Sequence, residues 1–246
     1  MLNNEIKTNN QIFIEKWKNF IDLLGKYMNE NFSTDSDLIS HSLSKISILR
    51  KDSDFLDLCR EIRNQYSHKK AFDNYVDIQQ TLLEKLDKII SDIESFMNLT
   101  ASKIMITNIR KTNKNECISD LVFEMKEKTY TAIPIVNEEE KVIGVFSESS
   151  LLNYFANHKE VCLARDEKIS EFFKDDGSIV EDEIGFARKN EYYLFSSKRT
   201  PVFKLKKIFT EKFEKGDRVG AIFITENGKQ SERLLGIITS WDLVGK

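Results

Sequence analysis

Residues 59–70, CREIRNQYSHKK, place an arginine and a histidine five positions apart, with an asparagine directly after the arginine. Histidine takes or gives a proton near neutral pH, and an arginine guanidinium holds two phosphate oxygens. RNA cleavage needs a base for the ribose 2′-hydroxyl, an acid for the leaving oxygen and a positive charge on the phosphate. Arg63, Asn64 and His68 are therefore candidate catalytic residues.

The spacing of these residues sets a geometric condition. On a continuous helix, side chains five positions apart point about 140° away from each other. One Arg63–His68 pair does not converge on one phosphate, but two pairs facing each other across a two-fold axis can do so. The alternative is structural: cations near the end of a helix complement its dipole, and Arg63 can pair with Glu61, Asp57 or an acid on another helix.

Glycine and proline divide the chain into two parts. Of nine glycines and two prolines, only Gly25 lies before residue 101, and these residues mark turns. Apolar residues recur at helical spacing in 13–24 and 82–97, with Asp73 or Asn74 as the expected cap of the last helix. The sequence predicts an α+β protein, with an antiparallel helical bundle in residues 1–100 and strands in residues 101–246.

An internal repeat organises the second part. The β-rich runs 131–136 and 141–146 form one expected hairpin, and 219–225 and 233–239 form another. A helical pattern precedes each hairpin, at 115–128 and 201–215, and another follows each, at 147–158 and from residue 239 onward. The second unit carries additional residues around 175–197, and its acidic run is expected to be a solvated loop. Such duplication is typical of a fold built from two similar units.

The two units resemble a tandem pair of CBS domains, a Bateman module. The matching residues are AIPIVNEEEKVIGVFSESSLL and AIFITENGKQSERLLGIITSWDLV. The resemblance covers residues 102–246, with repeat 1 at about 102–160 and repeat 2 at about 161–246. It implies that the module binds an adenine nucleotide (AMP, ADP or ATP) in a cleft between the repeats and associates as a dimer.

The second repeat carries the better nucleotide site. Thr239 ends a strand where a helix is expected to begin, which suits a phosphate oxygen, and the carboxylate of Asp242 could accept hydrogen bonds from a ribose diol. The alternative is a capping box, which needs no ligand. Repeat 1 has Ser147 and Ser150 at these positions, so we expect its site to be weaker, altered or empty. The other expected nucleotide-binding residues are Gly220 and Ala221, whose small size admits a purine, and Ile222, Ala132 and Ile133.

The first part resembles the HEPN superfamily of helical domains, whose signature is an arginine followed four to six residues later by a histidine. RNQYSH carries this resemblance, which extends over residues 10–100. It implies a metal-independent endoribonuclease that is active as a dimer, or a member that has lost activity. Some nuclease members add a tyrosine two residues after the histidine, where this chain has Lys70.

Composition excludes several other classes. The formal net charge of −3 argues against a general nucleic-acid or anionic-membrane binder, and no apolar run approaches the roughly 20 residues that span a bilayer. The beginning of the chain lacks a signal-peptide pattern, and its three cysteines and three histidines show no metal-ligand spacing. We therefore expect a cytoplasmic homodimer, either a nucleotide-responsive ribonuclease acting on RNA or a non-enzymatic nucleotide sensor.

Overall fold

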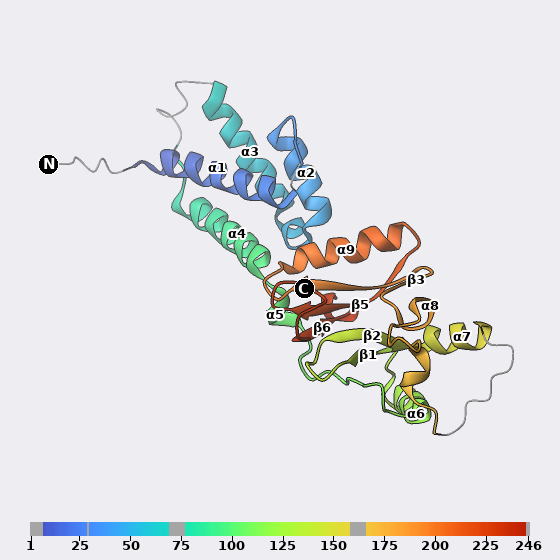
Figure 1. Ribbon diagram of the computed structural model, residues 1–246. Helices are drawn as coiled ribbons and strands as arrows, with labels where there is room; N and C mark the ends of the chain where they lie inside the picture. The colour runs from blue at the N-terminus through green and yellow to red at the C-terminus, as the bar shows by residue number, and fades with distance from the viewer. Residues whose placement is uncertain (1–6, 29, 69–76, 158–165, 245–246) are drawn as a thin grey trace. The chain divides into compact units, whose positions relative to one another are not determined.

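A computed structural model of the chain describes residues 7–28, 30–68, 77–157 and 166–244. The chain divides into two compact units, Met1–Asn98 and Leu99–Lys246. The first contains only helices and the second contains helices and strands (Figure 1). Among the described residues, no helix has both the length and the apolar character required to cross a membrane.

Helices of the first unit surround one apolar core. They are α1 (Asn9–Met28), α2 (Asp35–Lys45), the 3₁₀ helix η1 (Ser47–Asp52), α3 (Ser53–His68) and α4 (Gln80–Asn98). The helical stripe expected from the sequence is buried, with Phe13, Trp17, Phe20 and Leu24 at its centre. Thr34 is the N-cap residue of α2, and its hydroxyl oxygen accepts a hydrogen bond from the Asp37 amide at 3.2 Å. The helical spacing of apolar residues in the sequence therefore predicted the buried face of α1 correctly.

The direction of α4 differs from the prediction of an antiparallel bundle. Lys16 of α1 pairs with Asp87 of α4, and Tyr27 packs against Phe96, so both helices advance in the same direction. Asn9 Nδ2 donates to the Ile78 carbonyl at 2.8 Å, and the Ile78 amide donates to Asn10 Oδ1 at 3.1 Å. These bonds hold the start of α4 at the end of the unit where α1 begins. The two helices are parallel because the chain returns to that end before α4.

The predicted start of α4 is also corrected. Residues 77–79 are not helical, and α4 begins at Gln80. The expected caps, Asp73 and Asn74, lie outside the described residues. The asparagines of α1 bind the backbone immediately before the helix, so long-range contacts, which a local pattern does not reveal, accompany this start.

Both predicted hairpins of the second unit are confirmed. Strand β1 (Ala132–Val136) pairs antiparallel with β2 (Val142–Ser147), and β5 (Arg218–Thr225) pairs antiparallel with β6 (Gly236–Ile238). Helix α6 (Ile118–Lys128) precedes the first hairpin and α7 (Glu148–Asn157) follows it. Helix α9 (Val202–Glu214) precedes the second, and only the 3₁₀ helix η4 (Trp241–Leu243) follows it.

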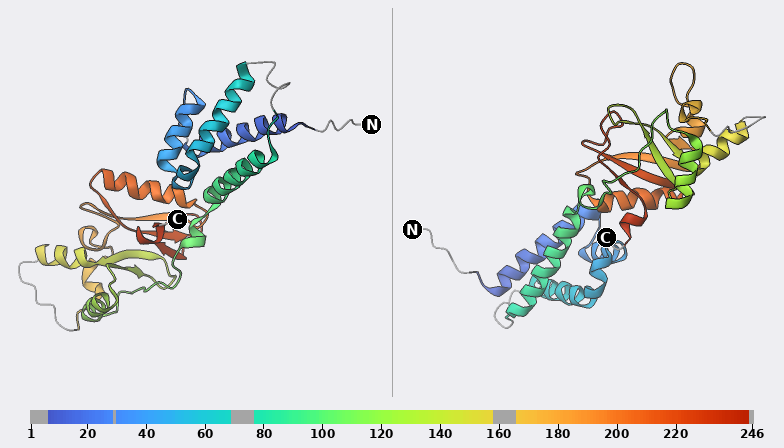
Figure 2. Two further views of the ribbon diagram at one scale, coloured as in Figure 1. Left: turned by 180° about the vertical axis from the view of Figure 1, so that it is seen from behind. Right: turned by 90° about the horizontal axis from the view of Figure 1, so that it is seen from below.

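The segment around 175–197 is a solvated loop only in part, because Asp175 and Asp176 of its acidic run lie in an exposed turn. It contains the short helix α8 (Glu181–Ile184) and the strands β3 (Ala187–Arg188) and β4 (Glu191–Ser197). Strand β4 runs parallel to β5, with α9 connecting them, and completes the sheet order β3-β4-β5-β6. Helix α9 covers one face of this sheet (Figures 1 and 2), where Val202 and Leu205 pack on Ile222 and Ile224. The strand was missed because its neighbours are strongly charged.

The two repeats of the second unit interlock. Ile106, before the first hairpin, exchanges backbone hydrogen bonds of 2.9 and 3.0 Å with Ile237 of β6. The Leu234 amide donates to the Glu140 carbonyl at 3.0 Å. One apolar cluster contains residues of both repeats, including Val145, Tyr193 and Phe223. The repeats therefore share a core and fold as one body.

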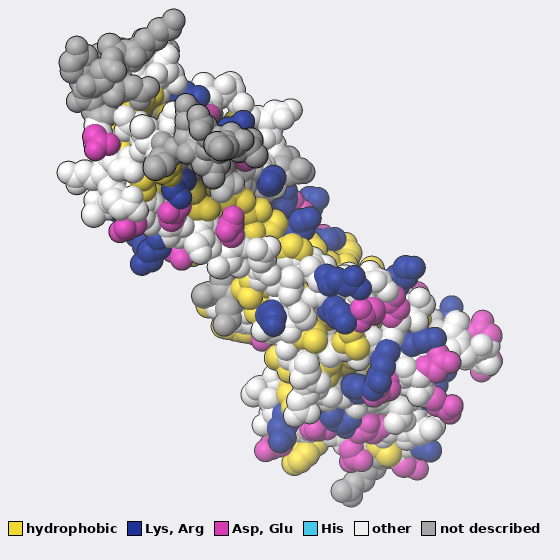
Figure 3. Space-filling model, turned by 90° about the vertical axis from the view of Figure 1, so that its left-hand side faces the viewer, with side chains coloured by type: hydrophobic (Ala, Val, Ile, Leu, Met, Phe, Trp, Pro, Cys, Tyr) yellow, Lys and Arg dark blue, Asp and Glu magenta, His cyan; other side chains and the backbone are white. Residues whose placement is uncertain are grey.

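Acidic and basic side chains are interspersed on the molecular face drawn in Figure 3. Apolar patches lie among them on this face. Such a mixture agrees with the small net charge of −3. It offers no extended basic stripe, the usual electrostatic footprint of a nucleic-acid-binding surface, on the part of the molecule described in this view.

Candidate functional site

Strand β6 ends at a threonine–aspartate pair. The Thr239 amide and hydroxyl both donate to Asp242 Oδ2, at 2.7 and 2.8 Å, and the Asp242 amide donates back to the Thr239 carbonyl at 3.2 Å. Both residues are partly exposed. The bond from the Thr239 amide to the carboxylate is one half of the capping box that the sequence left open as an alternative, and the two bonds to Oδ2 fix the carboxylate in one orientation. Oδ1 of Asp242 takes part in neither of these bonds.

The helix expected after Thr239 is much shorter than predicted. Only Trp241–Leu243 form a 3₁₀ turn, and Ser240, not Thr239, directly precedes it. The Leu243 and Val244 amides donate to the carbonyls of Ser240 and Trp241, both at 3.3 Å. Both bonds belong to a single turn of three residues, which is too short to act as a helix N-terminus, so the side chains of Thr239 and Asp242 are the groups that could hold a ligand.

Trp241 lies at the surface, with 83% of its area exposed. The sequence leaves open whether an aromatic residue at this place stacks on a base or fills the core and favours the core, so its exposure corrects that expectation. A 3₁₀ helix turns by about 120° per residue, so Leu243, which is buried, and Trp241 face different sides of the turn. An exposed indole beside Asp242 provides a flat surface on which an aromatic base could stack.

Gly220 does not leave room for a purine. A Cβ atom at this position would lie 2.6 Å from Cε1 of Tyr193, so the tyrosine ring already covers the glycine. The ring also stacks on Phe223, with centroids 6.1 Å apart. Burial, followed by the nearby charge of Glu191, raises the pKa of Tyr193 to about 12. The small residue admits an internal aromatic side chain.

The side chains of the remaining predicted strand residues pack into apolar clusters, although Ile222 pairs with Ile238, directly before Thr239. Ile133, Ala221 and Ile222 are buried in three different apolar clusters. Ala132 is half-buried and packs against the same cluster as Ala221. Their side chains are therefore occupied by packing. Of the eight residues predicted to contact a nucleotide, the structure brings Thr239 and Asp242 together.

Ser147 lies in a closed cluster of hydroxyl groups at the end of β2. Its amide donates to Ser150 Oγ at 2.9 Å, and its own hydroxyl lies 2.9 Å from Ser149 Oγ. Ser150 Oγ also donates to the Val145 carbonyl at 3.2 Å. Ser147 and Ser150 are buried. The polar groups at the end of the hairpin are thus buried in the first repeat and partly exposed in the second.

A buried arginine completes this cluster, and sequence reasoning missed it. Arg188 Nη1 donates to Ser150 Oγ at 2.8 Å and to the Glu183 carbonyl at 2.7 Å. Arg188 Nη2 forms an ion pair with Glu191 Oε2 at 3.1 Å, and Ser149 donates to the same carboxylate. The run EYYLF after the arginine, rich in β-forming aromatic residues, was the signal that this segment is a strand.

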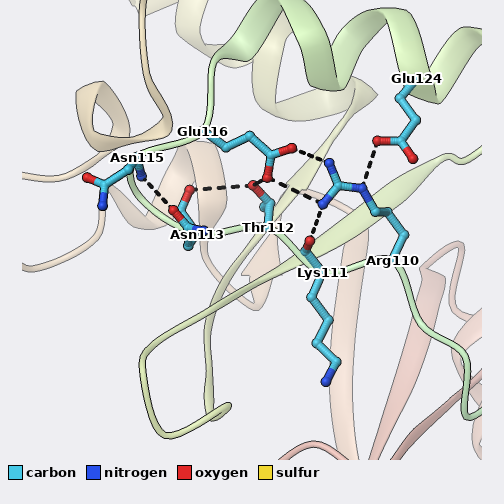
Figure 4. Close-up of polar contacts among 7 residues, drawn as sticks. All are labelled: Arg110, Lys111, Thr112, Asn113, Asn115, Glu116 and Glu124. Atoms are coloured by element: carbon cyan, nitrogen blue, oxygen red, sulfur yellow. Dashed lines mark hydrogen bonds and ion pairs between the residues drawn. The ribbon is translucent and has the colours of Figure 1, made fainter.

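A second network holds the start of the first repeat (Figure 4). Arg110 forms ion pairs with Glu116 and with Glu124, the latter at 2.7 Å, and Thr112 Oγ1 donates to Glu116 Oε2 at 2.8 Å. The hydrogen bond that Arg110 donates to Glu116 is the main cause that raises the pKa of Arg110. Thr112 also exchanges backbone hydrogen bonds with Pro134 and Val136. This arginine is fully engaged in fixing α6 beside β1.

The candidate catalytic residues lie on α3. Arg63 Nη2 is 3.8 Å from Asp35 Oδ2 of α2, and Nη1 donates to Asn64 Oδ1 at 3.4 Å. Its side chain is 41% exposed. His68 is the last residue of α3, and its side chain lies outside the described residues. The structural interpretation of Arg63, an ion pair with an acid on another helix, is therefore observed; convergence with His68 stays a prediction.

No cluster of three or more His, Cys, Asp or Glu side chains within the described ranges is arranged to hold a metal ion. Cys59 is buried, and desolvation raises the pKa of its thiol to about 12. Cys59 is therefore a small core residue, as the sequence predicted. Cys162 and His158 lie outside the described residues.

Several solved structures are similar to this chain. CBSX2 in complex with AMP is 17% identical, with a TM-score of 0.40, and the match covers 59% of this chain and 93% of that one. An uncharacterised conserved protein from Pyrococcus horikoshii is 16% identical, with a TM-score of 0.41 and coverages of 60% and 91%. The CBS domain of a bacterial CNNM/CorC family Mg²⁺ transporter in complex with ATP is 15% identical, with a TM-score of 0.41 and coverages of 65% and 94%.

Comparison with curated protein sequences gives no match. The family model described as CBS domain matches residues 101–157. This range contains α6, the β1–β2 hairpin and α7, which together make up the first repeat. Residues 101–157 are therefore similar to a CBS domain.

Proposed function

We propose that residues 99–246 form a regulatory module that binds an adenine nucleotide at the end of β6. The observation that supports this most is the fixed, partly exposed Thr239–Asp242 pair. The carboxylate is held through Oδ2 alone, so Oδ1 can accept a hydrogen bond from a ribose hydroxyl. A hydrogen bond to a charged acceptor contributes about 1.5–3 kcal/mol.

The neighbouring residues suit the rest of a nucleotide. The Thr239 hydroxyl donates to Asp242 and could donate to a phosphate oxygen instead, because a hydroxyl group rotates freely. The exposed face of Trp241 could stack on the adenine ring, an interaction worth about 1–3 kcal/mol per base. The ligand would therefore be AMP, ADP or ATP, with its ribose on Asp242, a phosphate on Thr239 and its base on Trp241.

Thermal unfolding with a panel of nucleotides tests this site. Ligand that binds only the folded protein raises its melting temperature, so AMP, ADP or ATP should stabilise the wild type, and Asp242→Ala should abolish the shift. Asp37→Ala is the matched control, because Thr34 and Asp37 have the same T-x-x-D spacing and the same hydrogen bond from the threonine hydroxyl to the aspartate. If the nucleotide shift survives Asp242→Ala, or is lost equally in Asp37→Ala, the assignment is wrong.

Fluorescence separates binding near Trp241 from binding elsewhere. The chain has two tryptophans, and Trp17 is buried in the first unit. In a Trp17→Phe variant the emission comes from Trp241 alone. We expect the bound nucleotide to quench it; saturable binding without any change in emission would place the nucleotide away from this turn.

We propose as a second candidate that the helical unit is a metal-independent endoribonuclease using Arg63, Asn64 and His68 from two copies of the chain. The observation in its favour is that Arg63 remains partly exposed and lies against Asn64 on one helix. Its contact with Asp35, at 3.8 Å, favours the alternative, a non-enzymatic unit that dimerises or docks a partner protein. In both cases the nucleotide must bind one geometry of the protein more tightly than another to regulate it.

Cleavage of labelled RNA distinguishes these alternatives. We expect an active enzyme to lose cleavage in the double variant Arg63→Ala, His68→Ala and to keep it in Arg60→Ala, a control on the same helix whose arginine pairs with Asp57. The assay is run with and without AMP and ATP. If the wild type cuts RNA no faster than the double variant under any of these conditions, the nuclease proposal fails and the nucleotide proposal is unaffected.

A further inference from the structure

The side chain of Arg188 is almost completely enclosed, with 2% of its area exposed. Its guanidinium is held by the Ser150 hydroxyl, the Glu183 carbonyl and the Glu191 carboxylate. Its Cζ atom lies 5.2 Å from the centre of the Tyr193 ring, within the range of a cation–π contact. Four groups of different chemistry thus surround one planar cation.

This cation lies where the first repeat should bind its ligand. Ser147 and Ser150 follow Gly144 by three and six positions, as Thr239 and Asp242 follow Gly236. At the last of these positions the second repeat has a carboxylate, which can accept hydrogen bonds from a ligand. The first repeat has a hydroxyl, and that hydroxyl accepts its hydrogen bond from Arg188.

We infer that the first repeat contains a guanidinium-binding site that is filled by the chain's own Arg188, which closes this repeat to nucleotides. The closure rests on the proposed function, since it assigns the nucleotide to the second repeat; the guanidinium site itself does not. Arg188 lies in β3, within the additional residues of the second repeat. A side chain of the second repeat therefore fills the site of the first repeat.

The surrounding groups explain why arginine is needed. Its fork of donors can reach a hydroxyl, a carbonyl and a carboxylate in one plane. Lysine is a point charge that cannot reproduce this fork. Nε and Nη2 of Arg188 are both buried without a hydrogen-bond partner. Nη2 is held by its ion pair with Glu191, and Nη1 makes the hydrogen bonds to Ser150 and Glu183. The Ser147 hydroxyl is buried within the serine cluster, whereas the Thr239 hydroxyl is partly exposed, so a phosphate can reach only the latter from solvent.

Chemical rescue tests the guanidinium site. Arg188→Ala leaves a hole shaped for the lost group and lined by Glu191. We expect about 10 mM methylguanidinium to raise the melting temperature of this variant by about 3 °C or more, and to leave the wild type unchanged. Methylammonium at the same concentration, and Arg110→Ala with methylguanidinium, are the controls, because Arg110 is about one quarter exposed and its partners are open to water. Equal effects of the two cations on Arg188→Ala would overturn the proposal.

Two further measurements keep the outcomes distinct. If Arg188→Ala does not fold, Arg188→Gln retains a smaller polar group and is tested in the same way. Nucleotide stoichiometry is measured on the wild type: one per chain agrees with closure, and a second nucleotide lost on Ser147→Ala would overturn it. If no nucleotide binds but the guanidinium rescue succeeds, the proposed function fails while the guanidinium site stands.

Discussion

The two repeats of the second unit end their hairpins in the same way but leave different surfaces. In repeat 1, Ser147 and Ser150 open an α-helix of 10 residues and are buried around Arg188. In repeat 2, Thr239 lies before a 3₁₀ turn of 3 residues, Asp242 lies within it, and both remain partly exposed. The difference follows from one position, Ser150 in repeat 1 and Asp242 in repeat 2. The Ser150 hydroxyl accepts a hydrogen bond from the internal Arg188, whereas the Asp242 carboxylate stays available to a ligand.

Removal of the internal cation should have the largest effect. Arg188→Ala leaves Glu191 buried without its ionic partner, and such a change costs about 3–5 kcal/mol. Arg110→Ala removes an arginine of the same repeat that is partly exposed, and partly exposed pairs contribute about 1 kcal/mol or less. Urea unfolding of residues 99–246, followed by circular dichroism, measures both. Equal losses would mean that burial does not distinguish the two arginines.

Conversion of repeat 2 to the pattern of repeat 1 should lower nucleotide affinity. Asp242→Ser replaces the charged acceptor with the residue found at position 150, and loss of a charged hydrogen bond of about 1.5–3 kcal/mol corresponds to a 10- to 100-fold weaker affinity. Calorimetric titration measures the change. Ser150→Ala is the parallel substitution in repeat 1 and should leave the affinity unchanged; an unaltered affinity in Asp242→Ser would remove the distinction between the repeats.

Gly220 and Gly25 should respond in opposite directions to alanine. At Gly220 the new Cβ would lie 2.6 Å from the Tyr193 ring, and such overpacking costs about 1–3 kcal/mol. At Gly25, inside α1, a Cβ would meet none of the described atoms within 4 Å, so alanine should add up to about 1 kcal/mol from helix propensity. Thermal unfolding of both variants measures this. Stabilisation by Gly220→Ala would show that the ring does not occupy this space.

The smallest effect concerns the turn of the second hairpin. The Asn227 backbone amide and, to a smaller degree, the Asn227 side chain donate hydrogen bonds to Glu232. These bonds lower the pKa of Glu232 from its ordinary value of 4.5 to about 2. A lowered pKa contributes stability above the unfolded value, and this contribution is lost as the pH falls from about 4.5 to about 2. Glu232→Gln should therefore be slightly less stable than the wild type at pH 7 and equal to it near pH 2. A difference that does not change across this range would contradict the assignment.

The sequence predicted the parts of the fold that have local signals. Periodicity located the buried face of α1, and β-rich runs located both hairpins. The parallel direction of α4 and the place of β4 in the sheet depend on contacts between distant residues, such as Asn9 with Ile78 and Tyr193 with Ala221. The same limit applies to the site, where the spacing of Thr239 and Asp242 was visible but the cover of Tyr193 over Gly220 was not.

The number of nucleotides bound by each chain tests the central claim most directly. Calorimetric titration of the wild type with AMP, ADP and ATP, repeated on Asp242→Ala, gives this number without assumptions about activity. The account predicts one site per chain in the wild type and none in Asp242→Ala. Two sites per chain, or a single site that persists in Asp242→Ala with unchanged affinity, would contradict it.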